Sequence, residues 1–227
     1  MKRVYCLSGL GADRRIFSRL EVPGVEFVHL DWIVPRKNET IGDYAGRMSE
    51  QLPSAYRDDK DRKEAADPYR DLVFMGVSFG GMMAVEMAKS LPGARVILIS
   101  SVVHHRQLPL WMKWAGRLQL NRLVPSKPWK WTMKLGNSFL GARTEQERQL
   151  CNEFRRNADP VYLHWAIRQV LNWRNEWKPA GYAHIHGNRD RTFPIGRISP
   201  THIVRGGGHF MVMTQAGELS AILAGLL

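Results

Sequence analysis

Three side chains of this sequence have the types and the chain order of a nucleophilic catalytic triad. Ser78 lies in the stretch 76–80, Gly-Val-Ser-Phe-Gly, which follows an apolar run and precedes a helical pattern. A tight turn between a buried strand and a helix holds a serine hydroxyl clear of the backbone, and the flanking glycines let neighbouring segments approach. A glycine-rich loop that packs closely, or that binds phosphate through backbone amides, is the alternative interpretation. Ser78 is therefore a candidate nucleophile that needs partners.

The partners are a base that takes the serine proton and an acid that orients the base. Asp190 follows a short strand predicted at 183–187, and His209 follows a strand predicted at 201–205. Taken singly, Asp190 could be a turn former and His209 a solvated loop residue. All three residues, however, come at the carboxyl ends of predicted strands, where an open α/β sheet collects its active site. We predict a Ser78–His209–Asp190 triad.

Other histidines compete with His209 for the role of base. His104 and His105 follow the strand predicted at 94–100, so they could line the same pocket. They precede Asp190 in the chain, which is the reverse of the expected order. His184 and His186 alternate along one strand, and we expect them to point the same way into the packing.

The negative charge that develops on a substrate carbonyl needs two backbone N–H donors. We expect one from Phe79, the residue after the nucleophile, and the other from the loop after the first strand. That loop is Ser-Gly-Leu-Gly-Ala-Asp at 8–13, with Leu10 as the first candidate donor and Gly11 as the second. A plain strand-to-helix turn would also explain the loop, and Asp13 is expected to cap the following helix in either case.

The elements that must position these groups alternate along the chain. Strands are predicted at 3–7, 25–30, 72–77, 94–100, 183–187 and 201–205, and helices at 14–20, 40–53, 80–91 and 213–226. The alternation predicts a parallel sheet of about six strands with right-handed crossovers. The segment 56–71 is dense in charge and lacks apolar periodicity, which predicts an exposed loop or a solvated helical turn.

The motifs at 76–81, 186–194 and 207–209 resemble those of the α/β-hydrolase family. The loop at 8–11 resembles the family's His-Gly-x-x-Gly oxyanion segment, with Ser8 in place of the usual His. The resemblance implies an α/β-hydrolase core at 1–101 and 181–227 and a helical cap at 102–180. It also implies that the family's first strands are missing here, because the chain starts at the strand before the oxyanion loop.

The same resemblance implies the chemistry. A serine at the turn is typical of ester, thioester, amide or C–C bond hydrolysis, whereas an aspartate would indicate a dehalogenase or an epoxide hydrolase. We expect a carboxylesterase- or thioesterase-like serine hydrolase that forms an acyl-enzyme on a small acyl substrate and needs no metal or organic cofactor. The alternatives are a non-catalytic ligand-binding protein on the same scaffold, or a C–C or amide hydrolase.

The stretch 102–180 holds seven of the eight tryptophans, and it matches no other motif. Thr144 has the pattern of a helix cap, with a helix predicted to about 158 and another over 160–173. Tryptophans of a cap can line an acyl pocket or fasten the cap to the sheet, and we favour fastening for most of them. Trp111, Trp114 and His104 are the candidates for substrate contact.

The sequence is strongly basic, with 33 Lys and Arg against 21 Asp and Glu and a net charge of +12. Basic residues alternate with tryptophans in the cap (Lys113, Arg117, Arg122, Lys127, Lys130 and Lys134). Such a pattern can meet phosphates and stack bases, but the charge is spread over the chain and no nucleic-acid motif is present, so nucleic-acid binding is disfavoured. The hypothesis that we favour is attraction of an anionic substrate.

A chain of 227 residues with 44% hydrophobic content can bury one core without metals or disulfides. Cys6 and Cys151 make no disulfide framework, which is typical of a reducing compartment. We see no secretory signal and no apolar run near the ~18–20 residues of a membrane span, so we expect a cytoplasmic protein.

Overall fold

The computed structural model describes residues 1–57, 69–119, 137, 140–142 and 144–227. In these ranges six strands form one sheet in the order β2-β1-β3-β4-β5-β6, and all neighbouring pairs are parallel. The strands are β1 (Lys2–Leu7), β2 (Val25–His29), β3 (Val73–Val77), β4 (Arg95–Ile99), β5 (Tyr182–Gly187) and β6 (His202–Val204). The predicted α/β class and the parallel sheet of about six strands are confirmed.

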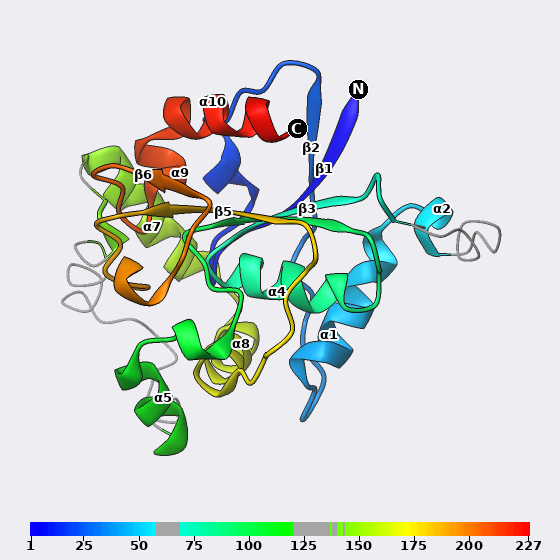
Figure 1. Ribbon diagram of the computed structural model, residues 1–227. Helices are drawn as coiled ribbons and strands as arrows, with labels where there is room; N and C mark the ends of the chain where they lie inside the picture. Colours follow the sequence, from blue (N-terminus) through cyan, green and yellow to red (C-terminus); the bar gives the residue numbers. More distant parts are fainter. Residues whose placement is uncertain (58–68, 120–136, 138–139, 143) are drawn as a thin grey trace.

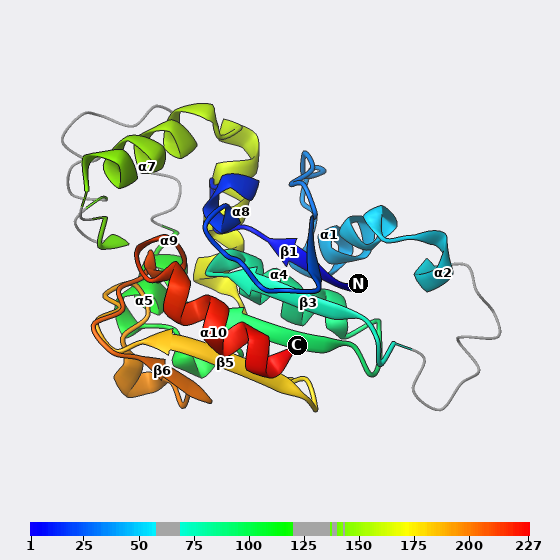
Figure 2. The same cartoon turned by 90° about the horizontal axis from the view of Figure 1, so that it is seen from above.

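Helices cover both faces of the sheet (Figures 1 and 2). One face carries α1, α4 and α8, and the other carries α9 and α10. The α-helices are α1 (Ile41–Met48), α2 (Ser54–Arg57), α4 (Phe79–Ala88), α5 (Leu110–Arg117), α7 (Glu145–Asn157), α8 (Pro160–Asn172), α9 (Met211–Thr214) and α10 (Ala216–Leu226). Short 3₁₀ turns are η1 (Arg14–Phe17), η2 (Ser49–Gln51), η3 (His105–Gln107) and η5 (Ile195–Arg197).

The central strands are buried on both faces, which explains why their sequences are continuously apolar. In β3, Phe74 packs into the cluster that contains α4, while Val73 and Met75 pack into the cluster that contains α10. The alternation follows from the two-residue period of a strand.

Three predicted helices differ in extent from the observed ones. The segment 14–20 forms only the four-residue turn η1, capped by Asp13 as predicted, because the side chain of Asp13 accepts from the Arg15 N–H. The helix predicted at 40–53 changes to the 3₁₀ turn η2 after Met48. The closing helix is divided into α9 and α10 at Gln215, whose φ of −135° and ψ of 37° are not helical. The apolar pattern along the sequence predicted which residues face the sheet. It did not predict where a helix is replaced by a tighter 3₁₀ turn.

The order of the strands fixes where loops meet. From β1 the chain goes to β2 on one side and returns to β3 on the other, so the connections leave β1 and β3 in opposite directions. A crevice forms at such a switch point, outside the carboxyl ends of the two strands. The loop 8–13 and Ser78 both begin at this edge of the sheet.

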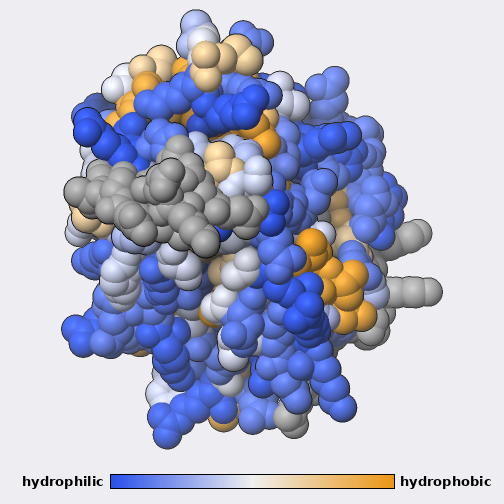
Figure 3. Space-filling view, turned by 90° about the vertical axis from the view of Figure 1, so that its right-hand side faces the viewer, coloured by the Kyte–Doolittle hydropathy of each residue, from blue (hydrophilic) through white to orange (hydrophobic). Residues whose placement is uncertain are grey.

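The surface in Figure 3 is largely hydrophilic, with small separate apolar patches. Helix α2 ends within the start of the charge-dense segment 56–71, and the part of the prediction that concerns 58–68 falls outside the described residues. Among the residues that the structure describes, no helix combines the length and the apolar character needed to cross a bilayer.

Candidate active site

Ser78 lies at the turn from β3 into α4 with φ 55° and ψ −119°. Few residues other than glycine adopt this region, and such strain persists only where the surroundings enforce it. Here the Ser78 N–H donates to the Ile99 carbonyl (3.0 Å), and the Ser78 carbonyl accepts from the Gly81 N–H (3.0 Å) and from Ser101 Oγ (2.6 Å). The backbone is therefore held on both sides while the side chain is left to project.

Two glycines permit this turn because they lack a Cβ and so let chain segments approach closely, not because they adopt a positive φ. A Cβ on Gly80 would collide with the carbonyl oxygens of Leu7 and Ser8 at the end of β1, and a Cβ on Gly76 would collide with the backbone of Gly80. Glycine is needed at both positions because the turn packs directly on the neighbouring backbone segments.

The structure brings the three predicted triad residues together. His209 Nδ1 lies 2.8 Å from Asp190 Oδ2, and His209 Nε2 lies 2.9 Å from Ser78 Oγ. A carboxylate only accepts, so Nδ1 carries the proton and Nε2 accepts from the serine hydroxyl. This is the arrangement that a nucleophile, base and orienting acid require.

Asp190 is held ionised by its surroundings. Its side chain is buried, and Oδ1 accepts from the N–H groups of Thr192 (2.8 Å) and Phe193 (2.9 Å). Burial by itself raises the pKa of this carboxyl, but the nearby His209 and these hydrogen bonds outweigh burial, so the pKa is lowered. The carboxylate can therefore fix the His209 tautomer throughout the neutral range.

His184 and His186 are buried in the packing, as predicted. His186 Nε2 donates to the Phe193 carbonyl (2.8 Å), and its Nε2 is 3.6 Å from Asp190 Oδ2. His184 Nε2 donates to the Ser101 carbonyl (3.0 Å). Burial lowers the pKa of both rings, to about 3 for His184, so both are neutral at pH 7. They support the loops that carry the acid and Ser101 rather than competing with His209.

The candidate oxyanion donors lie on the two segments that meet at Ser78. The position of a Cβ on Gly9 would be 3.6 Å from Ser78 Cβ, so the loop after β1 passes directly beside the nucleophile. Within the described ranges, no acceptor takes the backbone N–H of Leu10 or of Phe79. Both groups are free to donate to a ligand, although the assignment of these two donors stays a prediction.

The three predicted substrate-contact residues have different surroundings. Trp111 and Trp114 on α5 are 54% and 58% exposed, and the Arg117 guanidinium lies 5.8 Å from the Trp114 ring centroid. His104 is half-buried and stacks on His105 with ring centroids 4.7 Å apart. Within the described residues, none of these three side chains forms a hydrogen bond with a triad residue. Their contact with substrate stays a prediction.

Two other tryptophans, in α8 and at its end, join this helix to the segment before α1 and to α4. Trp165 is buried and its Nε1 donates to the Glu39 carbonyl (2.9 Å), while Trp173 Nε1 donates to Glu86 Oε1 (2.7 Å). Helices α7 and α8 match the predicted ones, with the predicted Thr144 cap accepting from the Glu147 N–H. Six of the basic and tryptophan residues singled out in 102–180 lie outside the described residues: Arg122, Lys127, Trp129, Lys130, Trp131 and Lys134.

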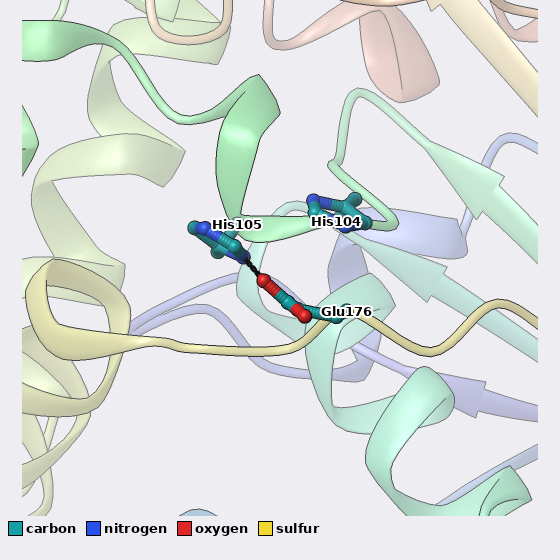
Figure 4. Close-up of side chains that lie close together, drawn as sticks. All are labelled: His104, His105 and Glu176. Carbon is teal, nitrogen blue, oxygen red and sulfur yellow. Dashed lines mark ion pairs between the residues drawn. The ribbon is translucent and has the colours of Figure 1, made fainter.

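His104, His105 and Glu176 gather where β4 leads into η3, and their ligand atoms lie within 4.8 Å of one another (Figure 4). The set of donors fits a transition metal. However, His104 Nδ1 already accepts from the Arg106 N–H (3.0 Å), and His105 Nδ1 donates to the Asn175 carbonyl (3.0 Å). Burial lowers the pKa of His104, and His105, Arg106 and Lys178 lower it further, against the opposing effect of the Glu176 carboxylate. Because both Nδ1 atoms already have hydrogen-bond partners, we assign no metal to the cluster.

Two contributors to the site were not predicted from sequence. Ser101 donates to the Ser78 carbonyl, and Trp32 Nε1 donates to Ser8 Oγ (2.8 Å), which in turn donates to the Ala12 carbonyl (2.7 Å). Ser101 comes two residues after β4, so its place at a strand end was a signal that could have found it. Trp32 carries no comparable signal, because its partner depends on the path of the loop after β2.

The model of the alpha/beta hydrolase family matches residues 4–222. A comparison with curated proteins gives no match. Among solved structures, a thermophilic esterase from Thermogutta terrifontis is 14% identical, with a TM-score of 0.72, 100% of this chain covered and 89% of that chain. The N-acyl homoserine lactonase AidH is 13% identical, with a TM-score of 0.67, covering 100% of this chain and 89% of that one. An epoxide hydrolase from Bacillus megaterium is 12% identical, with a TM-score of 0.68, covering 99% and 93%. At these identities the structural likeness shows the fold.

Proposed function

The chain belongs to the alpha/beta hydrolase family, and we propose that it is a serine hydrolase that cleaves a small ester or thioester through an acyl-enzyme. The observation that carries the proposal is the hydrogen-bonded chain from Ser78 Oγ through His209 to Asp190, with distances of 2.9 and 2.8 Å. A neutral serine alone is a poor nucleophile, and this arrangement is what activates it.

In the proposed first step, Ser78 Oγ attacks the substrate carbonyl while its proton passes to His209 Nε2. Asp190 stabilises the imidazolium and keeps the ring in the useful orientation, and it stays ionised itself. The tetrahedral intermediate then collapses, and His209 returns the proton to the leaving alcohol or thiol. Water, activated by the same histidine, attacks the acyl-serine and releases the acid.

The negative oxygen of both intermediates is proposed to accept from the Leu10 and Phe79 N–H groups. These donors are backbone groups on the two segments that meet at Ser78, where Gly9 and Gly80 allow close packing before the reaction begins. Preorganised donors of this kind are worth about 2.7–4 kcal/mol each in acyl-transfer enzymes. The serine at position 8 leaves this function intact, because the donor is backbone rather than side chain.

The stretch 102–180 is proposed to act as a helical cap over this site, with an anionic substrate favoured by its basic surface. The surroundings of Lys113 support the preference for an anionic substrate. Burial lowers the pKa of Lys113, and so do three arginines, which indicates that these cations lie close together: Arg197, Arg106 and Arg174. Hydrolysis of p-nitrophenyl succinate should therefore weaken more than that of p-nitrophenyl acetate when NaCl rises from about 0.05 to about 0.5 M. Equal salt dependence of the two substrates would contradict the anionic preference.

The direct test replaces Ser78 by alanine and measures turnover of p-nitrophenyl esters, a thioester, an anilide and a lactone. We expect kcat/KM to fall by about 10⁴-fold or more for every substrate cleaved, with an unchanged melting temperature. Ser90→Ala, at an exposed position two residues after α4, is the matched control and should keep full activity. Full activity of Ser78→Ala would overturn the assignment.

The substrate panel also separates the alternatives. Cleavage of the anilide alone would indicate an amide hydrolase, and cleavage of none of them together with saturable ligand binding would favour a non-catalytic binding protein on this scaffold. A C–C hydrolase would use the same triad, so it requires a β-diketone substrate to be distinguished.

A further inference from the structure

The loop after β1 holds the proposed Leu10 donor on a tight turn. The Ala12 N–H donates to the Gly9 carbonyl (3.0 Å), and Gly11 has a φ of 73°, a conformation that favours glycine. Such a turn uses the N–H of its fourth residue and leaves that of its second residue, Leu10, unused. The direction of the Leu10 N–H therefore depends on how firmly the turn is held.

The buried side chain of Ser8 joins this turn to a distant residue, Trp32. Ser8 Oγ donates to the Ala12 carbonyl (2.7 Å) and accepts from Trp32 Nε1 (2.8 Å). An indole N–H can only donate, so the bond from Trp32 leaves the Ser8 proton for the Ala12 carbonyl. Consecutive hydrogen bonds of this kind strengthen one another. Trp32 thus helps to hold both ends of the turn.

The ring of Trp32 also contacts the second segment that carries a proposed donor. It stacks on the ring of Phe79, with centroids 5.3 Å apart and planes 29° apart. On α8, the Tyr162 ring lies 5.2 Å from that of Trp32. The turn itself rests on the same helix, because a Cβ on Gly11 would come within 3.1 Å of Leu163. Trp32 therefore touches both donor segments, and α8 supports the assembly.

We propose that Trp32 is a positioning residue for the oxyanion site. Through Ser8 its indole N–H fixes the turn that holds Leu10, and its ring fixes Phe79. This inference rests on the proposed acyl transfer at Ser78. Fixed donors stabilise the tetrahedral intermediate more than the bound ester, because the full charge forms on the oxygen only after attack. Trp32 therefore acts on kcat and hardly on KM.

Trp32→Phe keeps an aromatic ring and deletes the N–H group. We expect kcat and kcat/KM for p-nitrophenyl acetate to fall together by about 5- to 20-fold, with KM changed less than about twofold. The loss is smaller than the roughly 100- to 1,000-fold cost of removing a donor itself, because both backbone donors remain. A raised KM with unchanged kcat would show that Trp32 contacts the substrate instead, and would overturn the proposal.

Trp165→Phe is the matched control. It deletes an indole N–H from the same aromatic cluster, since the rings of Trp165 and Phe79 lie 6.1 Å apart. Its hydrogen-bond partner, however, is the Glu39 carbonyl, outside both donor segments. With assays run below the melting temperature of each variant, kcat of Trp165→Phe should stay unchanged. Equal losses of kcat in the two variants would reduce the effect of Trp32 to general packing and overturn the proposal.

Ser8→Ala tests the same chain of hydrogen bonds and decides the question if Trp32→Phe folds poorly. We expect it to lower kcat by a similar factor, and Trp32→Phe should then add less than about twofold in the double variant. Full kcat in Ser8→Ala, or losses that multiply in the double variant, would contradict the route through Ser8.

Trifluoroacetone measures the oxyanion site without turnover. Ser78 Oγ bonds to its carbonyl carbon, the hydroxyl proton passes to His209 Nε2, and the carbonyl oxygen becomes the oxyanion. In Trp32→Phe the inhibition constant should rise by the factor by which kcat/KM falls, and an unchanged constant would overturn the proposal. Ser78→Ala is assayed alongside. Activity in Ser78→Ala would contradict the serine mechanism and this inference with it, whereas inactive Ser78→Ala with full kcat in Trp32→Phe would contradict only the role of Trp32.

Discussion

The carboxyl edge of the sheet and the stretch 102–180 show two ways in which side chains acquire their positions. At the sheet edge, Ser78, Asp190 and His209 follow strands, and parallel pairing brings together Ser78 and His209, 131 positions apart. In 102–180, α7 and α8 form where expected but α5 was not predicted, and Trp165 on α8 is buried while Trp111 on α5 is exposed. A strand end fixes the place of a residue directly, whereas a helix leaves the choice of face to its neighbours.

The largest expected effect is on the chemistry at the sheet edge. In Asp190→Asn the amide oxygen takes the place of Oδ1, which accepts from the Thr192 and Phe193 N–H groups, so the N–H₂ group faces His209 Nδ1. Because an N–H₂ group donates, Nδ1 must accept, and the useful tautomer is lost. We expect kcat/KM for p-nitrophenyl acetate to fall by about 10⁴-fold. Asp43→Asn, at the exposed start of α1, is the matched control and should leave kcat/KM unchanged. A loss below about tenfold in Asp190→Asn would show that Asp190 is only a turn former.

The next effect is on the packing that supports the nucleophile. Gly80→Ala drives a Cβ into the carbonyl oxygens of Leu7 and Ser8, and we expect the free energy of unfolding to fall by about 3 kcal/mol in urea titrations. Gly46→Ala is the control, because a Cβ on this helical glycine meets nothing within 4 Å and should stabilise by up to about 1 kcal/mol. Equal changes in the free energy of unfolding for Gly80→Ala and Gly46→Ala would contradict the claim that position 80 has no room for a Cβ.

The sequence was sufficient for the fold class, the strands, the three triad candidates and the caps at Asp13 and Thr144, because each depends on local pattern or on strand order. It was insufficient where distant segments meet. The hydrogen bond from Trp32 Nε1 to Ser8 Oγ joins the loop after β2 to the loop after β1. The break at Gln215 likewise has no local signal, since its side chain bonds to the Arg205 carbonyl (3.1 Å) on a different loop.

A smaller effect on stability separates the buried Trp165 from the exposed Trp111. Trp165→Phe loses the hydrogen bond to the Glu39 carbonyl and part of the packing on Tyr44, so we expect a loss of about 2 kcal/mol in unfolding free energy. Trp111→Phe, at an exposed position, should change it by less than about 0.5 kcal/mol. A larger cost for Trp111→Phe would mean that α5 packs against something beyond the described residues.

Another effect concerns the pH dependence of stability. His184 has a pKa of about 3 when folded and 6.5 when unfolded, so only the unfolded chain gains the proton between these values. Stability is therefore full above pH 6.5 and falls as pH decreases, by about 1.4 kcal/mol per pH unit for this residue. His186 acts in the same direction. Urea titrations at successive pH values should show a flatter slope for His184→Gln, and an unchanged slope would contradict this origin.

The central claim is that Ser78 is an activated nucleophile, and the most direct measurement is its reaction with a fluorophosphonate. Intact-mass and peptide mass spectrometry should find one adduct per chain, located on Ser78, with esterase activity lost in proportion. The adduct should be absent in Ser78→Ala and slow to form in Asp190→Asn. No adduct on the folded protein, or an adduct elsewhere with Ser78 unmodified, would contradict the claim.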